Sequence, residues 1–180
     1  MPSNSVKILL TGPPGCGKTT AVMRIVERLA SHKVAGFCTQ EIRDSGKRVG
    51  FRWRRLGGVE GILAHVNIKG CYKVGRYGVD IAKFERSVVP VLDADRCGIE
   101  LFVIDEIGKM ECMSETFIAA VHGLLASDKC VLATVAQKGR GFIQQVKSRP
   151  DVTLLNLTRS RCAEAIDEIL QMLPFARCEL

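Results

Sequence analysis

The residues best suited to chemistry lie near the amino end, in the segment Gly-Pro-Pro-Gly-Cys-Gly-Lys-Thr at positions 12–19. It fits the pattern G-x-x-x-x-G-K-[ST], a glycine-rich bend that wraps the phosphates of a nucleoside triphosphate. Glycine permits backbone angles closed to other residues, and the amino end of a following helix adds positive potential. We therefore predict a phosphate-binding loop with these residues: Gly12, Pro13, Pro14, Gly15, Cys16, Gly17, Lys18, Thr19 and Thr20.

Two side chains of this loop are predicted to act on the phosphates and their counterion. Lys18 would place a cation on the β- and γ-phosphates, and the hydroxyl of Thr19 would bind Mg²⁺. Residues 6–10 form an apolar run typical of a buried strand. Residues 22–29 repeat apolar side chains at helical spacing. A strand, the loop and a helix therefore follow one another, as a phosphate-binding loop requires.

A pair of carboxylates follows a second apolar run in the middle of the chain. Residues 101–104 are all apolar, and Asp105 and Glu106 come directly after them. A buried strand of this kind carries its acids to the edge of a parallel sheet, where ligands bind. Asp105 is predicted to hold Mg²⁺, directly or through a water. Glu106 is predicted to orient a water and take its proton during attack on the γ-phosphate.

Segments of strand and helix character alternate along the chain, which predicts an α/β fold with a mostly parallel central sheet covered on both faces. We expect one domain over residues 1–180, with a β-hairpin inserted at about 38–66 because the apolar side chains there alternate with arginines. Further strands are expected over residues 34–40, 99–104, 130–135 and 152–157, and further helices over 80–92 (broken at Pro90), 114–125, 142–146 and 162–173.

The composition is that of a globular protein, with 47% hydrophobic and 25% charged residues among 180. No apolar run approaches the roughly 18 residues of a membrane span, and no signal peptide is visible. The eight cysteines form no C-x-x-C pair, which favours buried, reduced thiols. We therefore expect a cytoplasmic protein without a membrane partner, and a monomer.

The net charge of +7 includes a basic stretch over residues 43–55. RNA is a possible partner there, since bases could stack on Trp53 while the arginines bind phosphates. Trp53, however, shares the apolar strand face with Val49 and Phe51, which favours its burial. The arginines could equally solvate the hairpin or attract polyanions.

Hydrolysis of a triphosphate also requires a cation against the charge that develops in the transition state. Several basic residues near the ends of late elements are candidates, and Arg149 is preferred because it precedes the last strand: Lys138, Arg140, Arg149, Arg159 and Arg161. Thr134 ends the strand after the acidic pair and could sense the γ-phosphate.

The segment Ile-Asp-Glu-Ile-Gly-Lys-Met-Glu at residues 104–111 resembles the signature of the cancer-related nucleoside-triphosphatase family, first described from thermophiles. Residues 10–20, 36–43, 48–51 and 74–80 agree with the family in the same order. The resemblance implies a three-layer, RecA-like P-loop fold and Mg²⁺-dependent hydrolysis of ATP, GTP and other nucleoside triphosphates, with broad base tolerance and slow turnover. One departure is the segment 158–161, which lacks the family's asparagine.

The resemblance also implies site residues. Nucleotide contacts carry over to residues 12–19 and to the second segment, which comprises Leu101, Phe102, Val103, Ile104, Asp105, Glu106, Ile107 and Gly108. Lys109 and Glu111 would position the γ-phosphate or the water, although spacing alone also fits an exposed ion pair. The predicted catalytic residues are therefore Lys18, Glu106 and Lys109.

Two other functions remain compatible with the sequence. The same loop serves kinases that phosphorylate a nucleotide or a polynucleotide 5′-end, and residues 42–98 could contain an acceptor pocket. A nucleotide-switched RNA-binding module would use the basic stretch and hydrolyse slowly as a timer. Phosphate release with Mg²⁺ alone separates hydrolysis from the first alternative, and salt-dependent RNA binding would support the second.

Overall fold

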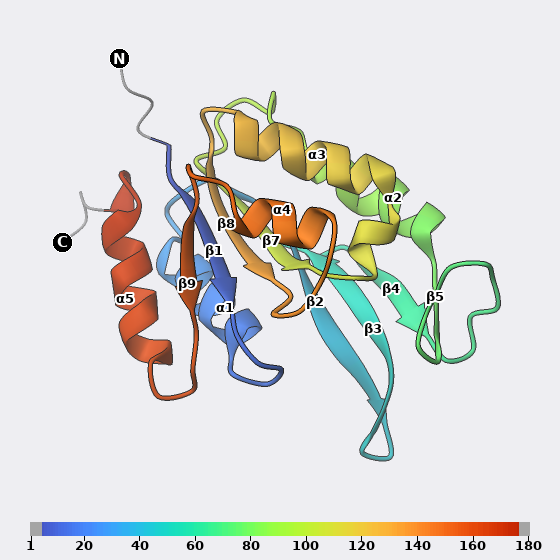
Figure 1. The fold of residues 1–180 in the computed structure, drawn as a ribbon. Helices are drawn as coiled ribbons and strands as arrows, with labels where there is room; N and C mark the ends of the chain where they lie inside the picture. The colour runs from blue at the N-terminus through green and yellow to red at the C-terminus, as the bar shows by residue number, and fades with distance from the viewer. Residues whose placement is uncertain (1–4, 177–180) are drawn as a thin grey trace.

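The computed structural model describes residues 5–176, and a nine-stranded sheet in the order β5-β6-β4-β3-β2-β7-β8-β1-β9 forms its centre (Figure 1). One half is parallel and consists of β2 (Val34–Asp44), β7 (Leu101–Ile107), β8 (Cys130–Val135), β1 (Lys7–Thr11) and β9 (Thr153–Asn156). The other half is antiparallel and consists of β3 (Lys47–Arg55), β4 (Glu60–His65), β6 (Tyr77–Val79) and β5 (Lys73–Val74). The predicted α/β fold is confirmed, and the predicted hairpin continues the sheet as β2, β3 and β4.

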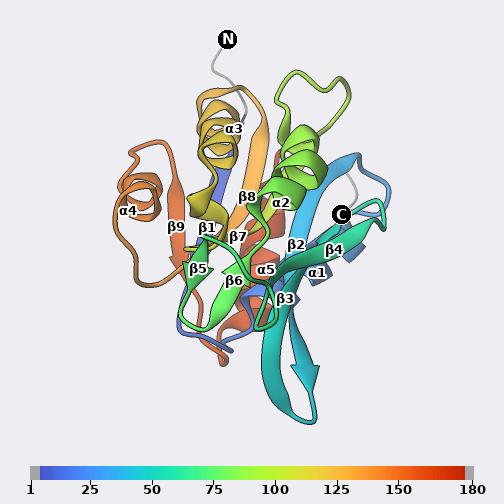
Figure 2. The same ribbon diagram turned by 90° about the vertical axis from the view of Figure 1, so that its right-hand side faces the viewer.

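Helices cover both faces of the parallel half, which makes three layers (Figure 2). One face carries α1 (Lys18–Arg28) and α5 (Cys162–Met172), and the other carries α2 (Ile81–Val88), α3 (Glu115–Ala126) and α4 (Phe142–Lys147). Successive strand residues point to opposite faces. Accordingly, Ile8 and Leu10 pack in the core beneath α1 and α5, whereas Leu9 packs in the core beneath α3.

Capping residues set where the helices begin. The Asp80 carboxylate accepts a hydrogen bond from the Lys83 amide at 3.0 Å at the start of α2. The Ser114 hydroxyl accepts one from the Phe117 amide at 3.0 Å at the start of α3. Both satisfy an amide that a helix terminus leaves unpaired. Pro90 lies in the short 3₁₀ helix η1 (Val89–Leu92) that ends α2, so the predicted break is confirmed.

The β2–β3 hairpin is joined to the main core through its aromatic side chains. Trp53 is 1% exposed and shares a core with Phe37, Phe84 and Phe117. The rings of Phe84 and Phe117 are 5.4 Å apart, and those of Phe37 and Phe84 are 5.6 Å apart. The predicted burial of Trp53 is therefore confirmed, which leaves no exposed indole on the hairpin for base stacking.

The strand order brings the two predicted site segments to one edge of the sheet. Leu10 of β1 is in register with Thr134 of β8, and Ile104 of β7 is in register with Ala133 of β8. The loop after β1, Thr134 and Asp105 therefore all lie at the carboxyl end of the parallel strands. Within residues 5–176, none of the helices has the length and apolarity that a membrane crossing requires.

The cysteines differ in part from the expectation of buried thiols. The seven cysteines among residues 5–176 form no disulfide, but Cys71 and Cys97 are exposed. Both lie in loops between elements rather than in the apolar strands that bury Cys38 and Cys130. Cys178 lies outside the described residues.

Candidate active site

Residues 12–17 form a tight loop between β1 and α1 that only glycine permits at two points. Gly12 has φ 157°, and a Cβ there would collide with the Leu157 carbonyl oxygen and come within 2.8 Å of Cys16 Sγ. Gly17, with φ 102°, occupies the left-handed region and precedes α1 directly. The ammonium of Lys18 donates to the Gly12 carbonyl at 3.2 Å, so it lies over the loop. Residues 12–18 therefore have the conformation that a phosphate-binding loop requires.

Two side chains, one within the loop and one outside it, hold the loop in place. Cys16 is 4% exposed and packs in the core below the loop. Arg159, which follows β9, donates from Nε to the Gly15 carbonyl at 3.1 Å. Arg159 was one of the candidate transition-state cations, and the structure gives its guanidinium a contact with the loop backbone.

Asp105 lies buried beneath the loop with one carboxylate oxygen unsatisfied. Its side chain is 1% exposed, and its Oδ1 accepts a hydrogen bond from Thr134 Oγ1 at 2.5 Å. No residue among those described here donates a hydrogen bond to its Oδ2. Burial raises the pKa of Asp105, while the hydroxyls of Thr134 and Thr19 act in the opposite direction. Thr134 therefore orients the carboxylate instead of contacting the cavity, because it is itself fully buried.

An unsatisfied buried carboxylate oxygen beside a threonine hydroxyl fits a hard divalent cation. Mg²⁺ prefers oxygen ligands and keeps several waters, so a P-loop site needs few protein ligands. Nowhere in residues 5–176 do three or more His, Cys, Asp or Glu side chains gather as a metal cluster. A cation here would therefore depend on Thr19, Asp105, water and substrate phosphates, the donor set that suits Mg²⁺.

Glu106 follows Asp105 through a cis peptide bond and lines the open cavity instead of the interior. Burial raises the pKa of Glu106, and the charge of Asp105 adds to this effect. The Lys18 ammonium opposes it and favours the ionised carboxylate. A carboxylate with a raised pKa is a stronger base at neutral pH than an exposed glutamate.

The loop and Glu106 share one cavity of about 780 Å³ with residues from two other segments. The cavity is lined by Gly12, Pro14, Gly15, Gly17, Lys18, Thr19 and Thr20 of the loop region, by Thr39, Gln40, Glu41, Arg48 and Phe51 of the hairpin, and by Glu106, Ala136, Gln137 and Lys138. Its size is typical of small-molecule sites. The hairpin residues were not predicted as part of the site.

Arg48 is held on the hairpin wall by three neighbours. Its Nη1 donates to Glu41 Oε1 at 2.8 Å, its Nε donates to the Tyr77 hydroxyl at 3.2 Å, and its guanidinium lies 5.2 Å from the centre of the Phe51 ring. A regular strand would place residues 48 and 51 on opposite faces. The register shift at Ile42/Arg43 interrupts that alternation, because Ile42 pairs with Gly50 and Arg43 with Arg48, which leaves Val49 as an extra residue in β3. Both side chains line the cavity.

A sequence model of the NTPase family matches residues 7–170. The chain belongs to this NTPase family. It is 38% identical over 174 residues to the nucleoside-triphosphatase THEP1 of Thermotoga sp. strain RQ2, a match that covers 97% of this chain and 99% of the relative. It is 36% identical over 185 residues to the human cancer-related nucleoside-triphosphatase, covering 94% of this chain and 97% of that protein. The resemblance noted in the sequence is therefore confirmed.

Solved structures agree with this NTPase over nearly their whole length. The crystal structure of THEP1 from the hyperthermophile Aquifex aeolicus superposes with a TM-score of 0.85 at 33% identity and covers 94% of this chain and 99% of that one. The solution structure of a human cancer-related nucleoside triphosphatase gives a TM-score of 0.81 at 35% identity, with 94% and 98% covered. The fold is that of a P-loop NTPase.

The NTPase structure corrects part of the predicted second segment. The side chains of residues 101–104 and of Ile107 are fully buried in the two cores. They cannot line the cavity, since β7 lies in the middle of the sheet with helices on both faces. Their role is to hold Asp105 and Glu106 in place. Pro13 is exposed outside the cavity wall, and Gly108 lies behind it.

Lys109 and Glu111 occupy different environments in the NTPase, which excludes the exposed ion pair. Lys109 is exposed and lines a neighbouring cavity, not the one that contains the loop. Glu111 is 5% exposed in the 3₁₀ helix η2 (Glu111–Met113), and burial raises its pKa to about 8. A Cβ at Gly108 would lie 2.7 Å from Glu111 Oε2 and 3.7 Å from Glu106 Cδ. Both carboxyl groups therefore approach this glycine.

Arg149 is not placed to act on a phosphate. Its guanidinium donates to both carboxylate oxygens of Asp151, at 2.9 and 2.6 Å, and to the Leu125 carbonyl at 3.1 Å. Leu125 is near the end of α3, before β8 begins, so this cluster lies at the amino end of the strands, away from the loop. The preferred transition-state cation was therefore wrong, because Arg149 precedes a parallel strand and so lies at the edge opposite the one where ligands bind.

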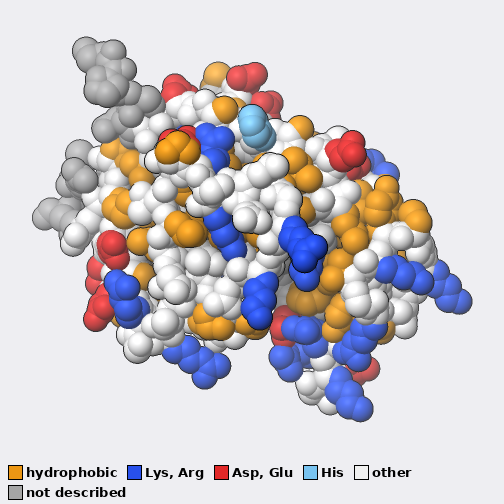
Figure 3. Space-filling view, in the orientation of Figure 1, with side chains coloured by type: hydrophobic (Ala, Val, Ile, Leu, Met, Phe, Trp, Pro, Cys, Tyr) orange, Lys and Arg blue, Asp and Glu red, His pale blue; other side chains and the backbone are white. Residues whose placement is uncertain are grey.

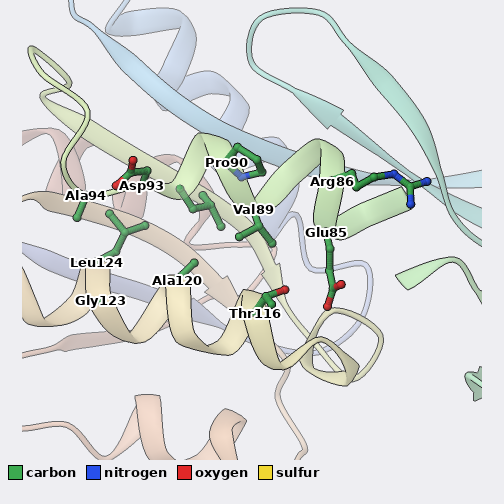
Figure 4. Close-up of a pocket in the computed structure, with 11 residues that line it drawn as sticks. Glu85, Arg86, Val89, Pro90, Asp93, Ala94, Thr116, Ala120, Gly123 and Leu124 are labelled. Carbon is green, nitrogen blue, oxygen red and sulfur yellow. The ribbon is translucent and has the colours of Figure 1, made fainter. Parts of the chain in front are cut away.

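A separate groove between α2 and α3 differs from the site in chemistry (Figure 4). Val89, Pro90 and Leu124 give it a mainly apolar wall, and its volume is about 600 Å³. Glu85 at one end accepts a hydrogen bond from Ser114 Oγ at 2.7 Å. The groove contains neither the phosphate loop nor the acidic pair, so it is not a candidate for the triphosphate.

Proposed function

We propose that the protein is a Mg²⁺-dependent nucleoside-triphosphatase that hydrolyses ATP, GTP and other nucleoside triphosphates to the diphosphate and phosphate. The observation that carries the proposal is that the phosphate loop and Glu106 line one cavity at the edge of the sheet, with Asp105 buried beside the Lys18 and Thr19 side chains. The relatives support broad base tolerance, because their names specify nucleoside triphosphates and no single base. Slow turnover is part of the same family resemblance.

The loop and Lys18 bind the triphosphate tail. Backbone amides of residues 12–19 surround the phosphates, and the Lys18 ammonium releases the Gly12 carbonyl to contact the β- and γ-phosphate oxygens. Thr19 and Asp105 would hold Mg²⁺, directly or through water, and the bound cation would neutralise charge on the same phosphates. Thr134 keeps the Asp105 carboxylate turned toward this position through its 2.5 Å hydrogen bond.

Glu106 acts as the base in this mechanism. It lines the cavity near Lys18, where it can accept a hydrogen bond from a water in line with the γ-phosphate. Burial raises the pKa of Glu106 above that of an exposed glutamate, while the Lys18 ammonium favours the ionised carboxylate. The water attacks the γ-phosphorus, its proton passes to Glu106, and the bond between the γ-phosphorus and the β–γ bridging oxygen breaks.

Arg48 supplies positive charge from the hairpin wall of the cavity. Its contacts with Glu41, Tyr77 and Phe51 fix the guanidinium before substrate arrives, and preorganised charge is what lowers the barrier of phosphoryl transfer. Lys138, one of the earlier candidate cations, lines the same cavity.

The structure gives less support to an RNA-switched module. The indole of Trp53 is buried, and arginines of the basic stretch form ion pairs with acids of the same sheet: Arg43 and Arg48 with Glu41, and Arg52 with Glu60. The names of the relatives favour hydrolysis over transfer to an acceptor.

Phosphate release from ATP, GTP, CTP and UTP, with and without Mg²⁺, tests the proposal. We expect release from all four nucleotides, dependent on Mg²⁺ and unaffected by added acceptors. Lys18→Ala is expected to lose nucleotide binding and turnover together. No phosphate release above the Lys18→Ala background, or release only when an acceptor is present, would contradict the proposal.

A further inference from the structure

Next to the nucleotide cavity lies a second cavity whose lining is strongly basic, here called the basic pocket. It has a volume of about 730 Å³ and is lined by Lys109, Gln137, Lys138, Gly139, Arg140, Gln144 and Lys147. Four of these seven residues are cationic and none is acidic. Figure 3 shows Lys and Arg side chains over α4 and the loop that precedes it. Four like charges around one hollow create a positive potential that attracts an anion.

The cations of the basic pocket lack the carboxylate partners that several other basic side chains have. Examples of such partners are the ion pairs Arg28–Asp167, Arg52–Glu60 and Arg149–Asp151. None of the four cations of the basic pocket is within ion-pair distance of an acid anywhere in residues 5–176. Lys147 donates to the Gln137 carbonyl at 2.8 Å and forms no ion pair within residues 5–176. A bound anion would offset the repulsion among the four charges.

The basic pocket adjoins the place where the proposed reaction ends. Gln137 and Lys138 line both cavities, so the two share a wall. Lys147 is close enough to Glu106 for the two charges to interact: burial lowers the pKa of Lys147, and the Glu106 carboxylate opposes that effect. A phosphate freed beside Glu106 therefore meets Lys138 first and the other three cations beyond it.

We propose that the basic pocket is a second phosphate-binding site, distinct from the phosphate loop, which takes the orthophosphate released by hydrolysis. The inference rests on the proposed function for the source of the phosphate, but the binding itself does not depend on turnover. A phosphate dianion suits the pocket, since Lys and Arg provide charge-assisted hydrogen bonds and the two glutamine amides provide further donors. The lining offers no aromatic ring on which a base could stack.

The direct test is a calorimetric titration of orthophosphate into protein saturated with Mg²⁺ and a non-hydrolysable ATP analogue. The analogue fills the phosphate loop, so any further binding occurs elsewhere. We expect saturable binding to the wild type, weakened at least about tenfold in Arg140→Gln/Lys147→Gln. The matched control Lys47→Gln/Arg54→Gln removes two exposed charges outside the pocket and is expected to bind like the wild type. No binding, or equal binding in all three proteins, would overturn the proposal.

Inhibition by the product gives a second, independent readout. If orthophosphate bound only at the loop, it would compete with ATP; binding in the basic pocket predicts inhibition that ATP does not overcome, and its loss in Arg140→Gln/Lys147→Gln. Purely competitive inhibition contradicts the proposal. A 5′-phosphorylated oligonucleotide that displaces orthophosphate and binds more tightly would reassign the pocket to phosphorylated chains.

The experiments distinguish a failure of the proposed function from a failure of the basic-pocket proposal. A protein that takes up no ATP analogue, or releases no phosphate, refutes the triphosphatase mechanism but leaves the basic pocket to be tested. For that case the titration is repeated on Lys18→Ala, in which the phosphate loop is disabled. Saturable orthophosphate binding that still requires Arg140 and Lys147 would support the pocket, and its absence would refute it.

Discussion

Replacement of the buried Glu111 by glutamine should change how stability depends on pH. Burial raises the pKa of Glu111 from 4.5 to about 8, so the folded protein keeps a proton that the unfolded chain releases. The free energy of unfolding therefore falls as pH rises from about 4.5 to about 8, by about 1.4 kcal/mol per pH unit. Over the whole shift the loss is on the order of 5 kcal/mol, a large share of a typical domain's stability. Glutamine does not titrate, so Glu111→Gln lacks this decline.

Urea unfolding of both proteins at pH 5, 6, 7 and 8 measures the effect. We expect the stability of Glu111→Gln relative to the wild type to increase steadily across the series. The neighbouring exposed Glu115 provides the control. For Glu115→Gln, the curve of unfolding free energy against pH should run parallel to that of the wild type. Parallel curves for Glu111→Gln and the wild type would show that Glu111 is ionised in the folded state and would refute the reasoning.

Three further substitutions test other contacts. Thr134→Val removes the hydrogen bond to Asp105 and should raise the Mg²⁺ concentration for half-maximal activity about tenfold or more, the usual effect of losing a ligand's partner; an unchanged requirement would contradict this role. Arg48→Ala should lower kcat by at least about tenfold with little change in nucleotide affinity. Arg52→Ala, which lies outside the cavity, should keep the wild-type kcat. A wild-type kcat in Arg48→Ala would remove Arg48 from the mechanism. Ser114→Ala should lower the free energy of unfolding in urea by about 1 kcal/mol, and no change would mean that the cap is dispensable.

The elements of the site with a local signature were predictable from the sequence. Residues 12–19 could be recognised as a phosphate loop because phosphate binding requires glycines and a lysine at fixed spacing. Asp105 and Glu106 follow an apolar run, and the rule that ligands bind at the carboxyl ends of parallel strands places them beside the loop. Ser114 and Pro90 marked a helix start and a helix break for equally local reasons.

Features that depend on strand order and register were not predictable. The hairpin wall with Arg48 and Phe51 depends on a register shift that breaks the regular alternation between these two residues. An exposed ion pair of Glu111 with Lys109 stayed open beside a role at the γ-phosphate, because nothing in the sequence shows that η2 turns the Glu111 carboxyl group inward. Arg149 is a different case, because its position before β9 already placed it at the amino end of a parallel strand, opposite the edge where ligands bind.

The most direct test of the mechanism measures nucleotide affinity and turnover together in Glu106→Gln. If Glu106 takes the proton of the attacking water, the variant binds the Mg²⁺–ATP analogue as the wild type does, while kcat falls by at least ~10²-fold. Turnover at the wild-type rate with normal binding would show that another group activates the water, and the central claim would fail.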